Sequence, residues 1–191
     1  MVKNSSLKFP LRLILINTNF LENELKQNFS LKNVSVSRQI FPFGLKIHVI
    51  TRTPVAYGEK ILNGEKILGF IDKNGFFIYR QNADGKNLDK LAIKVFGWKE
   101  KFKKILSEIF IAQDNYDFEI VKITFSADGF LTVEEKDLKT IFLGYKTNLI
   151  NYQLQIIDNL KIEFNKNNFS IKIENIDLTN PNKPKIKVFK P

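Results

Sequence analysis

The start of the chain carries a helical pattern of apolar positions. Large apolar side chains recur every four residues, at Leu21, Leu25 and Phe29. This spacing places them on one face and predicts a short amphipathic helix from Thr18 to Asn28. Asn19, followed three residues later by Glu22, has the spacing of a capping box, which satisfies free N–H groups at a helix start.

The pattern then changes to alternation of apolar and polar residues. It covers residues 34–40 and returns in residues 45–49, on either side of a turn at Phe41–Gly44. Alternation with a period of two is typical of strands that bury one face. The sequence therefore predicts a β-hairpin, against which the apolar stripe of the helix packs.

Pro54 interrupts the alternation after this hairpin. Because proline cannot donate a hydrogen bond to a sheet, Thr53–Gly58 is interpreted as an edge or a connector between two modules. The predicted domains are therefore residues 1–57 and 58–191. The second domain is expected to open with a hairpin of Lys66–Ile71 and Phe76–Arg80, because the Asn-Gly pair between them favours a tight turn.

Strands and two helices are predicted for the rest of the second domain. One helix covers Trp98–Gln113, with an apolar face of Phe102, Ile105, Leu106, Ile109 and Phe110. The other is marked by Leu149, Tyr152, Ile156 and Leu160. Strands are expected at residues 91–96, 118–125, 130–133, 170–178 and 185–189. The predicted fold class is α+β, with a helix on a β-hairpin followed by a mixed, mainly antiparallel β domain with two helices.

Composition narrows the classes of function. The chain has 191 residues, 43% of them hydrophobic, which is enough for a sizeable core. Its net charge of +10 comes almost entirely from lysine, since arginine occurs only at Arg12, Arg38, Arg52 and Arg80. Base readout and bidentate phosphate binding favour arginine, so the charge does not predict a nucleic-acid partner. A lysine-rich nucleic-acid binder is the weakest alternative.

Residues able to carry chemistry are few. Cysteine is absent, which excludes disulfides and thiolate metal sites, and His48 is the only histidine. His48 lies on the polar side of an alternating strand, without a nucleophile at a recognisable spacing. The run Glu134–Asp137 is interpreted as a solvated charge cluster, and Gly64, Gly69 and Gly75 as turn residues. The sequence predicts no catalytic residue, cofactor, metal site or small-molecule substrate, and therefore not an enzyme.

Two stretches resemble a known family. The first combines Val34-x-Val36-x-Arg38, Phe41-Pro42 and the run from Leu45 to Ala56. It resembles the end of the POTRA domain in the bacterial cell-division family FtsQ/DivIB. The second, Phe70-Ile71-Asp72-x-x-Gly75-x-Phe77, resembles the hairpin that opens the β domain of that family. The residues that carry the resemblance as structural motif positions are Arg38, Pro42, Leu45, Pro54, Val55, Ala56, Asp72 and Gly75.

The resemblance implies a partial POTRA domain followed by an FtsQ-type β domain. A complete POTRA domain begins with a strand and a helix that would precede the matched region, and the family has a membrane anchor before them. Either the start codon is assigned too far downstream, which we favour, or the sequence is a fragment. The resemblance further implies a bitopic inner-membrane protein, with this region in the periplasm.

The function implied is that of a non-catalytic divisome scaffold during septation. Its partners would be FtsB-like and FtsL-like proteins and the septal synthase pair FtsW and FtsI, bound through sheet edges. The docking edge is expected in the two C-terminal strands, at Ile176, Asp177, Leu178, Lys185, Ile186, Lys187 and Val188. The alternative is a POTRA-like factor for outer-membrane assembly or secretion, although such factors usually carry tandem POTRA repeats or a barrel.

Overall fold

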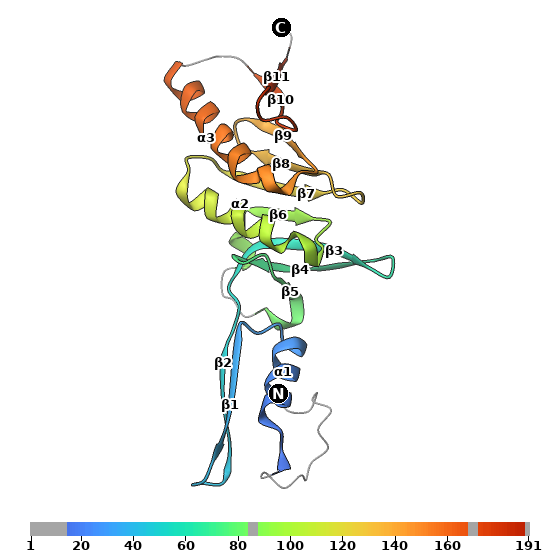
Figure 1. The fold of residues 1–191 in the computed structure, drawn as a ribbon, viewed down its shortest axis with the longest axis vertical. Coiled ribbons are helices and arrows are strands. Elements are labelled where there is room, and N and C mark those ends of the chain that lie inside the picture. The colour runs from blue at the N-terminus through green and yellow to red at the C-terminus, as the bar shows by residue number, and fades with distance from the viewer. Residues whose placement is uncertain (1–14, 84–87, 168–171, 190–191) are drawn as a thin grey trace.

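The computed structural model describes residues 15–83, 88–167 and 172–189. In these residues the chain forms a two-stranded sheet and a nine-stranded sheet. The strands of the large sheet lie across the long axis of the molecule, one above the next, and the small sheet lies below them beside a helix (Figure 1). The fold is α+β, as the sequence predicts.

Helix α1 (Thr18–Asn28) has the predicted bounds but a different cap. The N-cap is Asn17, whose side-chain oxygen accepts the N–H of Phe20 at 3.1 Å, so the predicted capping box at Asn19 and Glu22 is wrong. Glu22 instead accepts the N–H of Val36 at 2.6 Å. This bond joins α1 to the neighbouring strand and occupies a backbone donor that the hairpin leaves free.

The predicted β-hairpin is confirmed. Strand β1 (Asn33–Gln39) pairs antiparallel with β2 (Gly44–Ile50). The buried apolar residues shared by helix and hairpin are Ile16, Leu21, Leu31, Val34 and Val36. They form a core separate from that of the large sheet. We call α1, β1 and β2 the N-terminal module, and the large sheet with its helices the sheet module.

The segment interpreted as an edge or connector is an interior strand. Strand β3 (Pro54–Leu62) lies between β4 (Glu65–Asp72) and β6 (Ile93–Phe96). Pro54 is its first residue, a position that tolerates a missing N–H. The expected boundary between residues 57 and 58 therefore falls inside β3. The chain passes from one module to the other at residues 51–53.

The predicted turn at Asp72–Gly75 joins β4 to β5 (Phe77–Tyr79). The Asp72 carboxylate accepts the N–H of Phe76 at 2.9 Å and forms an ion pair with Arg52 at 2.6 Å. Gly75 has a φ of +76° and lies so close to α2 that a Cβ would be 2.3 Å from the carbonyl oxygen of Lys103. This turn is fixed from both sides and requires glycine.

The remaining elements form two crossovers and three hairpins. From β6 the chain runs through η5 (Glu100–Phe102) and α2 (Lys103–Asn115) into β7 (Ile120–Phe125), followed by β8 (Leu131–Glu135) and β9 (Lys139–Gly144). It continues through η6 (Thr147–Leu149) and α3 (Ile150–Asn167) into β10 (Ile173–Asp177) and β11 (Lys185–Val188). The sheet order is β11-β10-β9-β8-β7-β6-β3-β4-β5. The pairs β3–β6, β6–β7 and β9–β10 are parallel, and the others are antiparallel.

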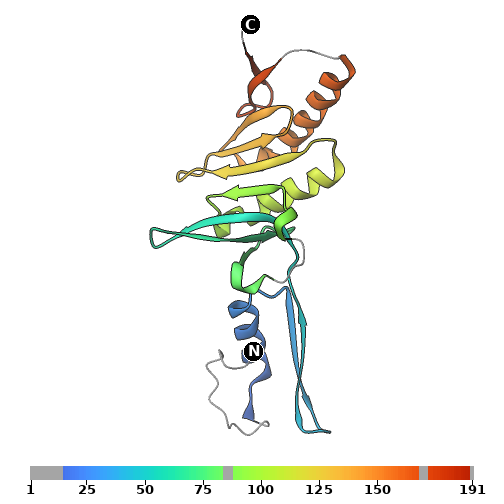
Figure 2. The ribbon, with the colours of Figure 1, turned by 180° about the vertical axis from the view of Figure 1, so that it is seen from behind.

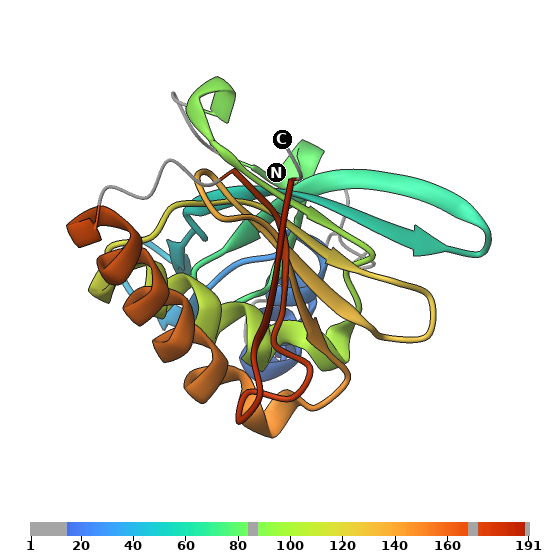
Figure 3. The ribbon, with the colours of Figure 1, turned by 90° about the horizontal axis from the view of Figure 1, so that it is seen from above.

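Both helices of the sheet module cover the same face of the sheet (Figure 3). The predicted apolar face of α2 is confirmed, but Trp98 precedes the helix and donates its indole N–H to the carbonyl of Gly75 at 2.8 Å. The predicted third helix is confirmed as α3, and Ile156 and Leu160 are half-buried against the core. Ile150, Leu154 and Ile157 are buried, whereas Tyr152 is 47% exposed. On the opposite face of the sheet, which we call the open face, the described residues place no long helix.

The charge cluster predicted to be solvated is partly buried. Glu135 is only 2% exposed and accepts a hydrogen bond from the ammonium of Lys161 at 2.6 Å and from the N–H of Leu138, also at 2.6 Å. Burial lowers the pKa of Lys161, but its hydrogen bonds to Asp137 and Glu135 outweigh that effect and raise the pKa overall. The pair joins α3 to the end of β8, so the solvated interpretation was wrong for Glu135.

Candidate partner-binding edge

Strand β11 ends the large sheet and has one neighbour, β10. All four of its residues are exposed. The other end strand, β5, is short and continues into η3 (Arg80–Asn82), where the Asn82 side-chain amide donates to the carbonyl of Asn28 in α1 at 3.0 Å. Figures 1 and 2 place the N-terminal module beyond β5 and β11 at the far end of the molecule. The predicted edge position of the last strand is confirmed.

The backbone of β11 presents hydrogen-bonding groups away from the sheet. The N–H of Phe189 donates inward to the carbonyl of Lys172 at 2.9 Å. Because N–H and C=O directions alternate along an antiparallel strand, the backbone N–H and C=O groups of Lys187 and Lys185 also point toward β10. The backbone groups of Ile186 and Val188 therefore point outward, where a further strand could pair with them.

The two faces of β11 differ in chemistry. Ile186 lies opposite Ile176 and Val188 opposite Ile173, so both continue the helix-covered face beyond α3. They are 41% and 42% exposed, which leaves apolar surface at the rim of the core. Lys185 and Lys187 lie on the open face, where Lys187 forms an ion pair with Glu174 at 2.8 Å. The edge is thus apolar on one side and basic on the other.

The residues predicted in β10 and just after it support this edge from within. Ile176 and Leu178 are fully buried, and the carbonyl of Leu178 accepts the side-chain amide of Gln153 in α3 at 2.7 Å. The hydroxyl and the N–H of Thr179 both donate to Asp177, and these bonds lower the pKa of its carboxyl. Of the seven predicted partner-binding residues, those in β11 alone present a free strand edge.

The family-motif residues occupy structural positions. The guanidinium of Arg38 donates to the carbonyl of Ile16 at 2.8 Å, Leu45 packs against the core of the N-terminal module, and Pro42 lies at the exposed hairpin tip. Pro54, Val55 and Ala56 begin β3, and Ala56 is fully buried. Asp72 and Gly75 form the turn described above. His48 is exposed on β2.

Within the described residues, no group of three or more His, Cys, Asp or Glu side chains is arranged to hold a metal ion. In the same part of the chain, no helix combines the length and the apolar character needed to cross a bilayer. No protein-family model matches the chain, and no curated protein matches it significantly.

Proposed function

We propose that this protein is a non-catalytic scaffold of the bacterial divisome, of the FtsQ/DivIB type, that recruits partners by strand addition. The observation that carries the proposal is the free edge at β11, which ends a large sheet and exposes all four of its residues. An edge strand of this kind is a template for a strand from another chain.

The edge defines what a partner strand would look like. Its backbone would pair with the outward groups of Ile186 and Val188, which supply affinity without sequence preference. Its side chains on the helix-covered face would extend the apolar surface of Ile186 and Val188. On the open face, acidic side chains would lie next to Lys185 and Lys187. A segment that alternates apolar and acidic residues fits both faces and sets one register.

The assignment to cell division draws on the family resemblance. Its supports are the order of the two modules and the structural use of the motif residues, among them Arg38, Asp72 and Gly75. The partners proposed are FtsB-like and FtsL-like proteins and the septal synthase pair FtsW and FtsI. The protein would act on the periplasmic side of the inner membrane.

A proline at position 186 tests the edge. The N–H of Ile186 points away from β10, so Ile186→Pro removes an outward donor and costs no hydrogen bond within the sheet. We expect the affinity for an FtsB-like partner from the same cell to fall by at least about tenfold. The melting temperature should stay within about 4 °C of the parent, because the core is untouched. Isothermal titration and a thermal melt measure the two quantities.

The matched control is Ile186→Ala, which keeps the N–H and shortens the side chain. It should bind more tightly than the proline variant, since backbone pairing dominates strand addition. Unchanged affinity of a folded Ile186→Pro variant would refute the β11 edge as the docking surface. Cross-links from a barrel protein to Gly44–Ile50, together with that result, would favour the outer-membrane assembly alternative.

A further inference from the structure

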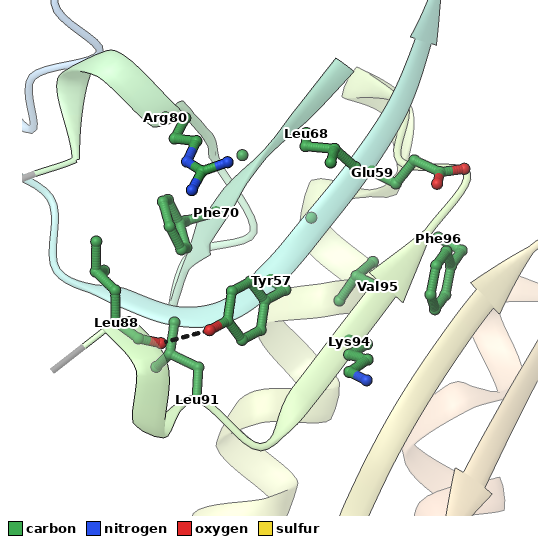
Figure 4. Close-up of a pocket in the computed structure, with 12 residues that line it drawn as sticks. Tyr57, Glu59, Leu68, Phe70, Arg80, Leu88, Leu91, Lys94, Val95 and Phe96 are labelled. Atoms are coloured by element: carbon green, nitrogen blue, oxygen red, sulfur yellow. Dashed lines mark hydrogen bonds between the residues drawn. The ribbon is translucent and has the colours of Figure 1, made fainter. Parts of the chain in front are cut away.

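A groove lies on the open face of the sheet module, across β3, β4 and β6. It has a volume of about 620 Å³, within the range of ligand-binding pockets. Its floor is formed by residues of the three strands, and one wall is formed by Leu88 and Leu91 (Figure 4). Apart from Phe70, which begins the second stretch that resembles the family, the groove residues lie outside both stretches, and none of them lies in the β11 edge.

Strand register assembles the floor. Tyr57 on β3 lies opposite Lys94 on β6 and opposite Phe70 on β4. The rings of Tyr57 and Phe70 are 5.6 Å apart, and the Tyr57 hydroxyl donates to the carbonyl of Leu88 at 2.8 Å. That hydrogen bond fixes the wall to the floor. Figure 4 shows the tyrosine hydroxyl directed at the carbonyl of Leu88 in the wall.

The apolar surface extends beyond the groove along the hairpin of β3 and β4. Leu68 lines the groove and is 60% exposed. Ile61 lies two residues beyond Glu59 on the same face of β3 and is 63% exposed. A strip of apolar side chains on one sheet face, longer than the groove itself, suits an extended chain better than a compact small molecule.

Two cations, Arg80 and Lys94, line the groove beside this apolar strip. Neither Arg80 nor Lys94 forms an ion pair with a described residue. The carboxylate that lines the groove, Glu59, lies 3.4 Å from the ammonium of Lys66. Among the described residues, the groove therefore combines an aromatic and aliphatic floor with two cations and one carboxylate.

We propose that this groove binds an extended, acidic and apolar segment of a partner protein, as a second docking site distinct from β11. Apolar side chains of the segment lie on Tyr57, Phe70 and Phe96, and its carboxylates face Arg80 and Lys94. Five strand steps separate β6 from β11, or about 24 Å, so both sites can be occupied at once. The inference rests on the groove alone and does not require that β11 binds anything.

The test uses a fluorescein-labelled peptide of alternating leucine and glutamate and the full chain, with binding followed by anisotropy and by backbone NMR shifts. We expect shifts at Tyr57, Phe70 and Lys94. The variant Arg80→Glu/Lys94→Glu should raise the dissociation constant of the peptide at the groove by at least about tenfold. Leu68→Ser, at an exposed position, should weaken it as well. Ile186→Pro should leave these shifts unchanged.

The matched control is Lys32→Glu/Lys46→Glu, which changes the net charge equally on the N-terminal module, at two exposed lysines. It should bind the peptide like the parent. An equal loss of affinity in this control would overturn the proposal, because the attraction would then be unspecific. Shifts confined to β11 would also overturn it. Binding of phosphatidylglycerol vesicles to the groove, without binding of the peptide, would also overturn the proposal, because the occupant would then be a lipid.

Discussion

The two modules of this protein complete their cores to different degrees. In the sheet module, α2 and α3 cover one face of the sheet, and central residues such as Ile123, Val133 and Leu154 are fully buried. In the N-terminal module, β2 exposes Ile47, Val49 and Ile50, and α1 exposes Phe20. In a two-stranded hairpin with one helix, the spacing of apolar residues favours the observed elements, but these elements bury little apolar area. The local sequence pattern thus accounts for the helices and strands of both modules. The modules differ in how completely their apolar residues are buried.

The largest expected effect comes from a cavity in the sheet module. Leu154→Ala should lower the free energy of unfolding by about 4 kcal/mol, since the side chain is fully buried in α3. Leu21→Ala is the control in the N-terminal module. Trp98, the single tryptophan, reports on the sheet module, so its fluorescence in a urea titration should respond to the first variant only. Equal shifts would mean that the modules unfold as one unit.

Hydrogen exchange should sharpen the same contrast in the unmodified protein. We expect the N–H groups of residues 15–50 to be protected at least about a hundredfold less than those of β7, β8 and β9, because the smaller core opens locally. Exchange detected by NMR or mass spectrometry gives the comparison residue by residue. Uniform strong protection along the chain would show that the N-terminal module is stable as it stands.

The buried ion pair should give a smaller effect. Lys161→Met removes the cation beside Glu135 but keeps most of the apolar stem, and Glu135 retains backbone N–H donors. We expect a loss of about 2 kcal/mol, below the cost typical of breaking a buried pair. Lys166→Met, whose side chain is 67% exposed, should change stability by less than about 0.5 kcal/mol. Urea unfolding that is the same for both variants would contradict a structural role for Lys161.

Acid should produce the smallest effect, again in the sheet module. Hydrogen bonds from Ser126 and Tyr145 lower the pKa of Asp128 to about 2. A pKa lowered by folding contributes stability above the ordinary value of 3.8, and this contribution disappears as the pH falls toward about 2. Asp128→Asn should flatten this part of the stability profile. An NMR titration that placed the Asp128 pKa near 4 would contradict the hydrogen-bonded turn.

Local patterns predicted much of the fold. The bounds of α1, the first hairpin, the turn at Asp72–Gly75 and the apolar face of α2 follow from periodicity and turn chemistry. Strand β3 was misinterpreted because Pro54 and Gly58 weaken a strand signal. Gly58 is needed there because a Cβ would lie 2.8 Å from the side chain of Ile71 on the neighbouring strand. The packing of the Ile71 side chain against Gly58 is not visible in the local sequence.

The sites show the same limit. The docking edge was expected in the two C-terminal strands from the family resemblance and the strand pattern, and β11 does lie at the edge of the sheet. The burial of Glu135 was not, because it depends on Lys161, which is 26 residues away on α3. The groove could not be predicted either. It requires the parallel pairing of β3 with β6, which brings Tyr57 beside Lys94.

The stacking of strands along the long axis makes the sheet a spacer of defined length. Nine strands give eight spacings, or about 38 Å, between β5 beside the N-terminal module and the free edge at β11. A strand added at β11 would extend the sheet by one interstrand spacing, about 4.8 Å, in the same direction. A pull between the N-terminal module and such a partner would run along the interstrand hydrogen bonds. The weakest pairing between neighbouring strands would then set the force at which the assembly separates.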